Sequence, residues 1–281
     1  MTTTTESTKP ILVLGATGKT GRRVAQLLTE RGLPVRSGSR SAEPAFDWED
    51  PGTWPAALDG VGAVYVCFQP DIAFPGAVDV IAAFTAEAVE RGVTRLVLLS
   101  GRGEEAAEAA EAVVRESGVQ WTVVRAAFFH QNFSESFFLD SVLAGEIVLP
   151  VADAAEPFVD ADDIAEVVAA ALTEDRHAGQ TYEVTGPRLL TFAEVAAELT
   201  EAAGREVAFV PVSKEDYVAA LRAEGLPEEF AELFDLVTDG RNAYLAEGVQ
   251  QALARPPRDF TDYAVATAAT GVWAADERSA G

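Results

Sequence analysis

The sequence predicts an α/β protein built on a doubly wound parallel sheet, with a smaller mixed α/β lobe in its C-terminal part. Two observations predict this fold class. Over residues 11–125, short apolar runs alternate with amphipathic stretches of helical length, which is typical of βαβ units. From residue 183 onward, the order of apolar and amphipathic segments becomes mixed. The chain has 281 residues, of which 48% are hydrophobic, so it can bury a substantial core.

The apolar runs are the predicted strands of the sheet. The first run, Ile11–Leu14, is continuously apolar and ends at Gly15, as in a strand that is buried on both faces. The later runs at 34–36, 63–68, 95–100 and 121–125 are the further predicted strands. Helices are predicted between them at 20–30, 76–91 and 104–117, and each is followed within two residues by a glycine that suits a helix C-terminus.

The C-terminal part contains predicted elements of both kinds. Helix 164–172 follows Asp160-Ala-Asp-Asp163, whose carboxylates we interpret as an N-cap and first-turn acids rather than as a metal site. His177 lies in a polar loop and is expected to be solvated. The remaining predicted elements are a strand beginning near residue 183, helix 191–203, strand 207–210, a helix that starts at Ser213 and helix 227–237.

The charge of the chain excludes several classes of partner. It has 21 Lys and Arg residues against 45 Asp and Glu residues, which gives a formal net charge of −24. Such a field repels phosphate backbones and anionic lipid headgroups, so neither nucleic acid nor a membrane surface is an expected partner. With one cysteine and two histidines, the sequence also gives no basis for a metal site, and none is expected.

A glycine-rich loop, Gly15-Ala-Thr-Gly18-Lys-Thr-Gly21, follows the first predicted strand and opens the first predicted helix. Gly15 permits a tight turn, Gly18 lets the backbone approach a pyrophosphate, and Gly21 lets the helix pack closely on the strand. The N–H groups at the helix start provide an anion site. This context predicts a dinucleotide site in a sheet of the Rossmann type. The alternative is an ordinary glycine-rich turn between strand and helix.

The residues after the second predicted strand indicate which dinucleotide binds. Sites for NAD usually place Asp or Glu there to hold the ribose 2′-hydroxyl group. Here the segment Arg36-Ser-Gly-Ser39-Arg40 has no acid before Glu43. Ser39 and Arg40 can instead bind a 2′-phosphate through charge-assisted hydrogen bonds, so the predicted cofactor is NADP(H). The alternative is that Arg36 and Arg40 are solvated loop cations.

The predicted organisation has four parts. Residues 1–8 form a Thr-rich disordered tail, and 9–150 form an NADP-binding Rossmann domain to which 151–182 return. Residues 183–273 form the lobe on the substrate side, and 274–281 form a loose tail. The chain shows neither a signal-peptide pattern nor an apolar run near the roughly 18 residues that a membrane span needs, so a cytoplasmic location is expected.

Several segments together resemble the NmrA-like family of atypical short-chain dehydrogenases/reductases, and in particular its bacterial NADPH quinone- and azo-reductase-like members. They are residues 13–21, Arg40, 98–100, 117–118, 122–125, Asn132, 158–165, 185–186, 191–194 and 255–260, which span nearly the whole chain. The resemblance implies a Rossmann domain with a small lobe over the nicotinamide. By position, it implies cofactor contacts from Gly15, Thr17, Gly18, Lys19, Thr20, Gly21, Arg40, Phe68, Gln69, Pro70 and Ser100.

The sequence departs from the usual short-chain reductase at the proton relay. Such enzymes use Tyr-x-x-x-Lys, but no lysine occurs here between Lys19 and Lys214, and helix 104–117 contains no tyrosine. We interpret the acids of that helix as a solvated face; they are Glu104, Glu105, Glu108 and Glu111. Reduction of a simple ketone creates a basic alkoxide that needs a positioned acid, whereas a quinone delocalises the charge. The departure therefore favours an electron-poor conjugated acceptor.

A Phe-rich segment, 128–138, follows the last predicted strand of this half-sheet and is a candidate wall for a planar substrate. His130 is the candidate proton donor, with a structural histidine as the alternative. Phe packing between lobe and sheet, or at a homodimer interface, is the other interpretation of the segment. The candidate substrate contacts are Phe128, Phe129, Gln131 and Asn132, of which the two amides could instead cap backbone groups.

These features predict an NADPH-dependent oxidoreductase that reduces a small, planar, quinone-like or conjugated carbonyl substrate without a Tyr-x-x-x-Lys relay. A hydride-driven coupling or isomerisation in aromatic secondary metabolism belongs to the same class. The alternative is a non-catalytic NADP(H)-sensing regulatory protein that acts through a protein partner, and the missing relay fits that role as well.

Overall fold

The computed structural model describes residues 9–136, 138–226 and 228–274, and leaves the side chains of 229, 230, 233 and 236 undescribed. The predicted tail 1–8 and residues 275–281 of the predicted tail 274–281 therefore lie outside the described residues. The chain folds into two compact units. Unit 1 comprises Met1–Ala126, Ala161–Val184 and Gly248–Arg255, and unit 2 comprises Ala127–Asp160, Thr185–Glu247 and Pro256–Gly281.

Two long stretches fall in a different unit from the one that the sequence predicts, and the boundary predicted at residue 183 lies after Val184. Residues 127–160 belong to unit 2, because their strand β6 (Glu146–Leu149) pairs in parallel with β10 (Ala208–Pro211). Residues 248–255 belong to unit 1, because their helix α11 (Gly248–Leu253) packs against α7 (Ala161–Thr173) and β8 (Gln180–Val184).

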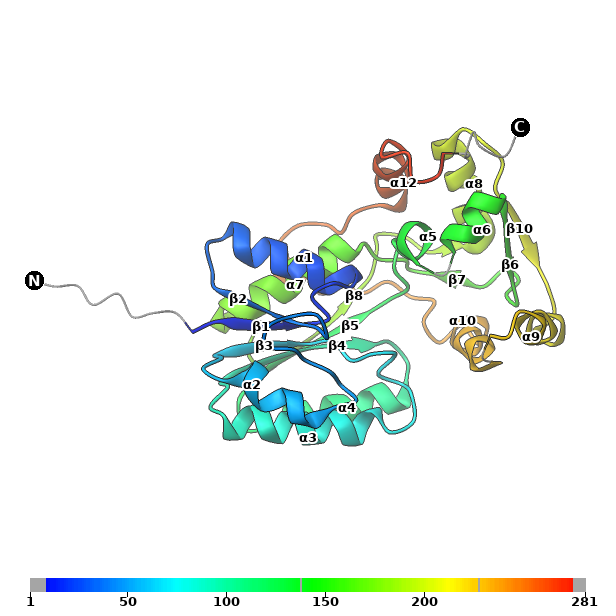
Figure 1. Ribbon diagram of the computed structural model, residues 1–281. Coiled ribbons are helices and arrows are strands. Elements are labelled where there is room, and N and C mark those ends of the chain that lie inside the picture. Colours follow the sequence, from blue (N-terminus) through cyan, green and yellow to red (C-terminus); the bar gives the residue numbers. More distant parts are fainter. Residues whose placement is uncertain (1–8, 137, 227, 275–281) are drawn as a thin grey trace, which may run out of the picture. The chain divides into compact units, whose positions relative to one another are not determined.

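Unit 1 contains the predicted parallel sheet. Its six strands have the order β2-β1-β3-β4-β5-β8, and every neighbouring pair is parallel. Helices α1 and α7 cover one face, and α2, α3 and α4 cover the other (Figure 1). Besides α7 and β8, the elements are β1 (Ile11–Leu14), α1 (Lys19–Glu30), β2 (Val35–Gly38), 3-10 helix η1 (Pro51–Thr53), α2 (Trp54–Leu58), β3 (Ala63–Val66), α3 (Ala77–Glu90), β4 (Arg95–Gly101), α4 (Glu105–Arg115), β5 (Gln120–Ala126) and 3-10 helix η2 (Asp175–His177).

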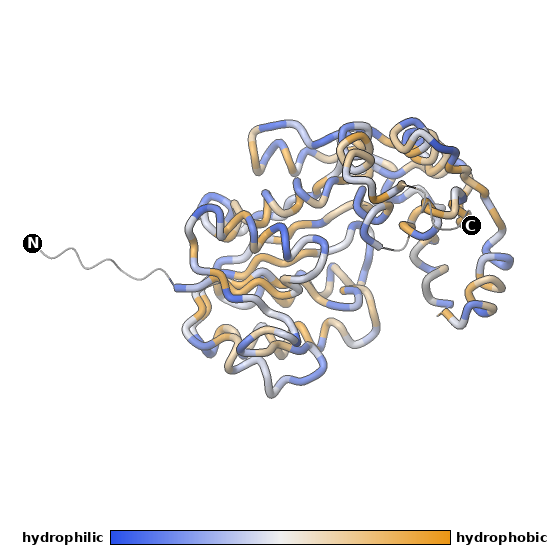
Figure 2. Tube along the Cα trace, turned by 45° about the horizontal axis from the view of Figure 1, so that its top comes forward, coloured by the Kyte–Doolittle hydropathy of each residue, from blue (hydrophilic) through white to orange (hydrophobic). Residues whose placement is uncertain are grey.

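The strand sequences explain why this sheet is buried on both faces. All four residues of β1 and all four of β3 are buried, and the tube of Figure 2 is largely orange, the colour of hydrophobic residues, along the central strands. On one face, Phe46, Trp54 and Phe84 pack against each other with ring centroids 5.6–6.5 Å apart. Covering helices on both faces are what a parallel sheet of continuous apolar strands requires.

The strand order places the ends of particular strands side by side. The chain passes from β1 outward to β2 and then returns to the opposite side of β1 to form β3. Such a reversal opens a crevice beyond the carboxyl ends of β1 and β3, where doubly wound sheets bind ligands. The loops that follow β1, β2, β3 and β4 therefore meet at one edge of unit 1.

Unit 2 is a mixed α/β body with two small sheets. Strands β6 and β10 are parallel, and β7 pairs with β9 in antiparallel fashion. Its buried core is rich in aromatic side chains, among them Phe133, Phe158 and Phe192. Besides β6 and β10, the elements are α5 (Asn132–Glu135), α6 (Leu139–Ala144), β7 (Ala155–Glu156), β9 (Leu190–Thr191), α8 (Phe192–Ala203), α9 (Lys214–Ala223), 3-10 helix η3 (Glu228–Phe234), α10 (Asp235–Thr238) and α12 (Phe260–Ala268).

The predicted α-helix 227–237 is wrong over most of its length. A 3-10 helix covers Glu228–Phe234, and α10 adds one short turn. The buried apolar residues Ala231, Phe234 and Val237 recur every three positions, which matches the three residues per turn of a 3-10 helix. By contrast, the predicted helix 191–203 is confirmed, and Thr191 and Glu194 form a capping box at its start.

The sequence predicts a solvated His177, but its side chain is fully buried and its Nδ1 lies 2.8 Å from the Tyr182 hydroxyl.

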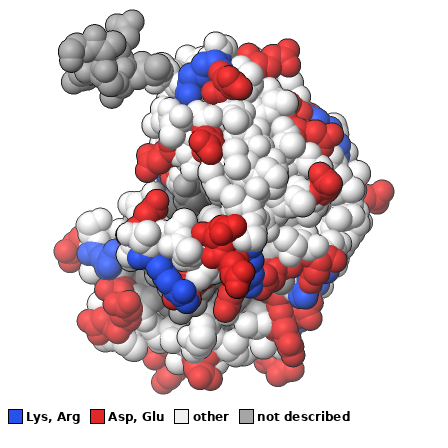
Figure 3. Space-filling model, turned by 90° about the vertical axis from the view of Figure 1, so that its right-hand side faces the viewer, with Lys and Arg blue, Asp and Glu red and all other residues white. Residues whose placement is uncertain are grey.

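Acidic side chains spread over the face of the molecule that Figure 3 presents, among fewer Lys and Arg. None of the helices in the described part of the chain is both long and apolar enough to cross a lipid bilayer.

Candidate cofactor site and the buried ionic network

The glycine-rich loop adopts the tight turn that its sequence predicts. Gly15 has a φ of +65°, and its N–H donates to the Gly38 carbonyl at 2.9 Å, which ties the ends of β1 and β2 together. A Cβ on Gly21 would lie 2.1 Å from the Gly15 carbonyl oxygen, so only glycine allows α1 to start this close to β1. The loop therefore holds the N-terminus of α1 directly beside the carboxyl end of β1.

The start of α1 suits an anionic group. Gly18 is the N-cap residue, no side chain caps the helix, and its first turn contains no acid. The N–H groups and the positive end of the helix dipole can therefore act on a bound pyrophosphate. Thr17 is exposed at this turn. Thr20 is buried instead, because its Oγ1 accepts a hydrogen bond from the Tyr65 hydroxyl at 2.9 Å, so the Thr20 hydroxyl faces the interior of unit 1.

The two arginines around β2 have different roles. Arg36 Nη1 donates to the carbonyl oxygens of Ala57 and Asp59 at 2.9 Å and 2.6 Å, which anchors the end of α2. Arg40 is exposed, and it forms neither a hydrogen bond nor an ion pair with the rest of the described chain. Ser39 lies beside it, half-buried. Arg40 is thus a cation available to a ligand, whereas Arg36 is not.

The loop after β3 completes the edge near the glycine-rich loop. Phe68 packs on Trp48 with ring centroids 5.0 Å apart, and a Cβ on Gly18 would lie 3.7 Å from the Gln69 Nε2. Gln69 and Pro70 are exposed there. A tight turn, an uncapped helix N-terminus and an unpaired arginine therefore lie around the carboxyl ends of β1, β2 and β3, and these residues fit a phosphorylated dinucleotide.

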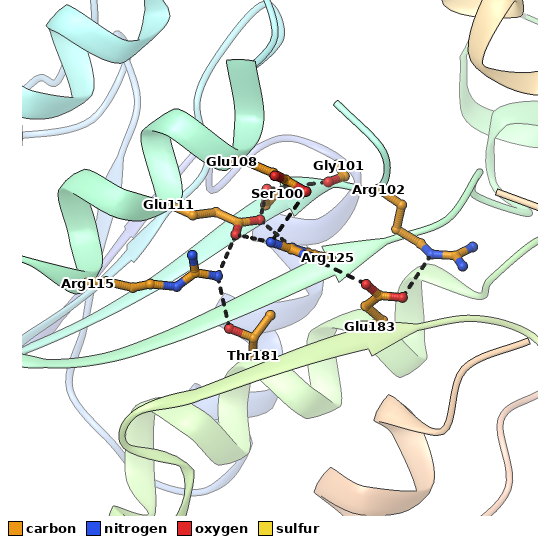
Figure 4. Close-up of polar contacts among 9 residues, drawn as sticks. All are labelled: Ser100, Gly101, Arg102, Glu108, Glu111, Arg115, Arg125, Thr181 and Glu183. Carbon is orange, nitrogen blue, oxygen red and sulfur yellow. Dashed lines mark hydrogen bonds and ion pairs between the residues drawn. The ribbon is translucent and has the colours of Figure 1, made fainter. Parts of the chain in front are cut away.

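Ser100, near the end of β4, belongs to a buried ionic network that Figure 4 shows. Its hydroxyl donates to Glu111 Oε1 at 2.7 Å. Arg125 of β5 donates hydrogen bonds to both oxygens of the same carboxylate, with Nε–Oε1 and Nη2–Oε2 distances of 2.7 Å and 2.6 Å. Arg115 Nη2 lies 2.6 Å from Glu111 Oε2. Glu183 of β8 extends the network through Arg125.

This network corrects the interpretation of α4 as a solvated acidic face. Glu111 has no exposed surface, and hydrogen bonds to its carboxylate raise the pKa of Arg125 above its usual value despite partial burial. The signal in the sequence is the position of Glu111 on the same helical face as Ala107, Ala110 and Val114, which are all buried. An arginine at the end of a buried strand needs such a carboxylate.

Two further acids, Glu104 and Asp71, also lie at the edge of unit 1 where the strands have their carboxyl ends. The sequence gives no clear signal for them. Glu104 directly precedes α4, and the pKa of its carboxyl is raised to about 7. Burial is the larger cause, and the negative charge of Asp71 is the second. Asp71 follows Pro70, and burial raises its own pKa although its Oδ1 accepts the Ala73 N–H at 2.8 Å. Burial by residues distant in the sequence causes both shifts, so no local pattern shows them.

In unit 2, the structure assigns His130 a structural role in place of the predicted proton donor. The side chain has no exposed surface and packs between Phe260 and Tyr263, with ring centroids 5.0 Å and 5.2 Å away. Its Nε2 donates to the Phe158 carbonyl at 3.0 Å, because a carbonyl can only accept. Nδ1 lies 3.6 Å from Asp160 Oδ2. The Nε2 proton of His130 is therefore held in a hydrogen bond to the Phe158 carbonyl inside unit 2.

The other candidate substrate residues are mostly interior. Gln131 is buried, and its Nε2 donates to Asp160 Oδ1 at 2.9 Å. Asn132 is also buried and starts α5. Phe128 and Phe129 are half-buried, and Phe128 packs 6.0–6.2 Å from the rings of its aromatic neighbours in the unit 2 core. Of this set, Phe128 and Phe129 keep exposed surface that a substrate could contact.

Comparisons with known proteins agree with this geometry. Residues 15–175 match the NAD(P)H-binding family model, and residues 108–264 match the NmrA-like family model. The NAD(P)H azoreductase of Xenophilus azovorans is 35% identical, and the match covers 92% of this chain and 98% of that protein.

A second relative and a solved structure extend the comparison. The (4-alkanoyl-5-oxo-2,5-dihydrofuran-3-yl)methyl phosphate reductase of Streptomyces griseus is 34% identical, with coverage of 90% and 96%. The structure of Citrobacter sp. triphenylmethane reductase complexed with NADP(H) has a TM-score of 0.73 at 23% identity, covers 92% of this chain and 99% of that chain, and therefore shares the fold.

Proposed function

The chain belongs to the NmrA-like family and carries an NAD(P)H-binding domain, and from this premise we propose that it is an NADPH-dependent oxidoreductase for planar acceptors with a conjugated quinone, carbonyl or azo group. The observation that carries the proposal is the ionic network of α4. Where a short-chain reductase would present tyrosine and lysine, this helix presents Glu111 and Arg115, which form an ion pair with each other, and Glu111 also binds Arg125.

The chemistry of the acceptor follows from this replacement. NADPH, when bound, supplies a hydride. Without a Tyr-x-x-x-Lys relay, an acceptor whose reduced form delocalises negative charge is favoured over a simple ketone, whose alkoxide is strongly basic. The names of two relatives support this class, since one reduces an azo compound and the other a ring whose double bond is conjugated with carbonyl groups.

The residues of unit 1 have defined roles in this proposal. The loop from Gly15 to Gly21 holds the pyrophosphate, and Ser39 and Arg40 hold the 2′-phosphate on the β2 side. A dinucleotide anchored in this way would reach from the β2 side toward the carboxyl ends of β3 and β4. The loop of Phe68, Gln69 and Pro70 and the end of β4 at Ser100 then lie along the nicotinamide half.

A panel of acceptors tests the proposal. Purified protein is mixed with NADPH and, in turn, a quinone, an unsaturated ketone, an azo compound and a saturated ketone, and absorbance near 340 nm is followed. We expect oxidation of NADPH with at least one conjugated acceptor and no turnover with the saturated ketone. Tight NADPH binding without oxidation by any acceptor contradicts the proposal and leaves a cofactor-sensing protein.

A further inference from the structure

We propose that Glu104 is the proton donor for the reduced acceptor, a role that rests on the proposed reductase function. The helix that lacks the usual tyrosine and lysine begins immediately after this residue. Four observations on the described residues support the assignment, and all of them concern unit 1.

The first two observations concern where the carboxyl group points. Glu104 is the N-cap residue of α4, but its side chain does not cap the helix. The carboxyl is instead turned back over Gly101, where a Cβ would lie 2.6–2.7 Å from both carboxyl oxygens and from Cδ. Glycine at position 101 therefore makes room for the Glu104 carboxyl at the carboxyl end of β4. In the proposed function, the nicotinamide half of the cofactor lies beside this strand end.

The third observation is a buried polar atom that has no hydrogen-bond partner among the described residues. Glu104 Oε2 is completely buried, and it makes no hydrogen bond within the part of the chain that the structure describes. A buried carboxylate oxygen without a donor is costly, whereas a neutral carboxyl group can hold its proton until an acceptor atom arrives. The site thus favours the acid form that a donor needs.

The fourth observation is the electrostatic surroundings. Asp71 faces Glu104 from the loop after β3 and raises its pKa, in addition to the larger effect of burial. The nearby cations are engaged elsewhere: Arg102, directly after β4, faces Glu183 at 3.7 Å, and Arg125 of β5 forms ion pairs with Glu111 and Glu108. A carboxyl with a pKa of about 7 is well matched to proton transfer near neutral pH.

The step balances as follows. The conjugated acceptor gains a hydride with its electron pair, and NADP⁺ is left. The oxygen, nitrogen or carbon atom that then carries the negative charge takes the proton from Glu104. The resulting Glu104 carboxylate recovers a proton from water, so one acceptor, one NADPH and one H⁺ give the reduced product and NADP⁺.

Steady-state rates against pH form the first test, with variants Glu104→Gln and Glu105→Gln. For the wild type, turnover of an unsaturated ketone is expected to fall as pH rises through about 7, because the donor must be protonated. Glu104→Gln is expected to lower the rate on the order of 10²-fold at about pH 6 and to remove the pH dependence. Glu105, exposed on the next position, is the matched control, and Glu105→Gln should keep the wild-type rate and profile.

A binding titration provides a readout that needs no turnover. The oxidised nicotinamide ring carries a positive charge and the reduced ring does not, so a Glu104 carboxylate should strengthen binding of NADP⁺ several-fold, on the order of 3–10-fold, as pH rises through about 7. NADPH binding should not show this rise, and Glu104→Gln should abolish it. Asp71→Asn should move the transition in the wild-type profile to lower pH, because the charge of Asp71 raises the pKa of Glu104.

The outcomes separate this inference from the proposed function. If no acceptor is reduced but the NADP⁺ titration depends on Glu104, the reductase proposal fails while the placement of the carboxyl beside the nicotinamide stands. If acceptors are reduced and Glu104→Gln keeps both the wild-type pH profile and the wild-type titration, the assignment of Glu104 is overturned and the reductase proposal stands.

Discussion

Replacement of Glu111 by alanine is expected to lower the free energy of unfolding by about 3–5 kcal/mol, because it removes a fully buried carboxylate and leaves two partly buried arginines without their counter-charge. Glu111 is fully buried and binds Arg125 through two hydrogen bonds, Arg115 through one and the Ser100 hydroxyl through another. Three of the four tryptophans, Trp48, Trp54 and Trp121, lie in unit 1. Their fluorescence during urea unfolding therefore measures the stability of the unit that carries the network.

Two further variants show whether the loss comes from the network. Glu108 also faces Arg125, at 3.7 Å, but it is exposed, so Glu108→Ala should cost no more than about 1 kcal/mol. Combining Glu111→Ala with Arg125→Ala should cost clearly less than the sum of the single losses, because the two residues form one unit. Equal, small losses for Glu111→Ala and Glu108→Ala would contradict the account of the network.

Replacement of Arg40 by alanine is expected to weaken NADPH binding by roughly 10–150-fold, while NADH binding changes by less than about threefold. The range corresponds to a charge-assisted hydrogen bond of about 1.5–3 kcal/mol to the 2′-phosphate. Arg40 is exposed and makes no hydrogen bond or ion pair elsewhere in the described chain, so its loss should not disturb the fold. Quenching or enhancement of cofactor fluorescence measures both dissociation constants.

Arg36 is the matched control for this substitution. It lies on β2 four residues earlier, but its guanidinium donates to the carbonyl oxygens of Ala57 and Asp59. Arg36→Ala should therefore lower stability and should not discriminate between the two cofactors. Losses of equal size for NADPH and NADH in the Arg40→Ala protein would refute the assignment of the 2′-phosphate.

The parts of the fold that depend on local patterns could be predicted from the sequence. The apolar run Ile11–Leu14, the glycines of the following loop and the alternation of strands and helices depend on neighbours within a few residues, and they predicted the parallel sheet of unit 1. The 3-10 helix Glu228–Phe234 was missed, because a spacing of three apolar positions also occurs within an α-helical pattern.

The acids of the candidate site could not be predicted in the same way. Glu104 and Glu111 stand in one short acidic helix sequence, where both resemble solvated charges. The charge of Asp71, from the loop after β3, acts on Glu104, and Arg125 of β5 binds Glu111. The fold brings both partners from distant parts of the chain. His130 shows the converse, because its neighbours Phe260 and Tyr263 lie more than a hundred positions away and remove it from solvent.

Deuterium transfer tests the central claim of a conjugated-acceptor reductase most directly. NADPH deuterated at the reactive C4 position is incubated with the protein and an unsaturated ketone, and the product is analysed by mass spectrometry. We expect the reduced product to carry one deuterium from the cofactor and one hydrogen from water. A reduced product that contains no deuterium from either face of C4, or cofactor that remains fully deuterated and unoxidised, would contradict the account.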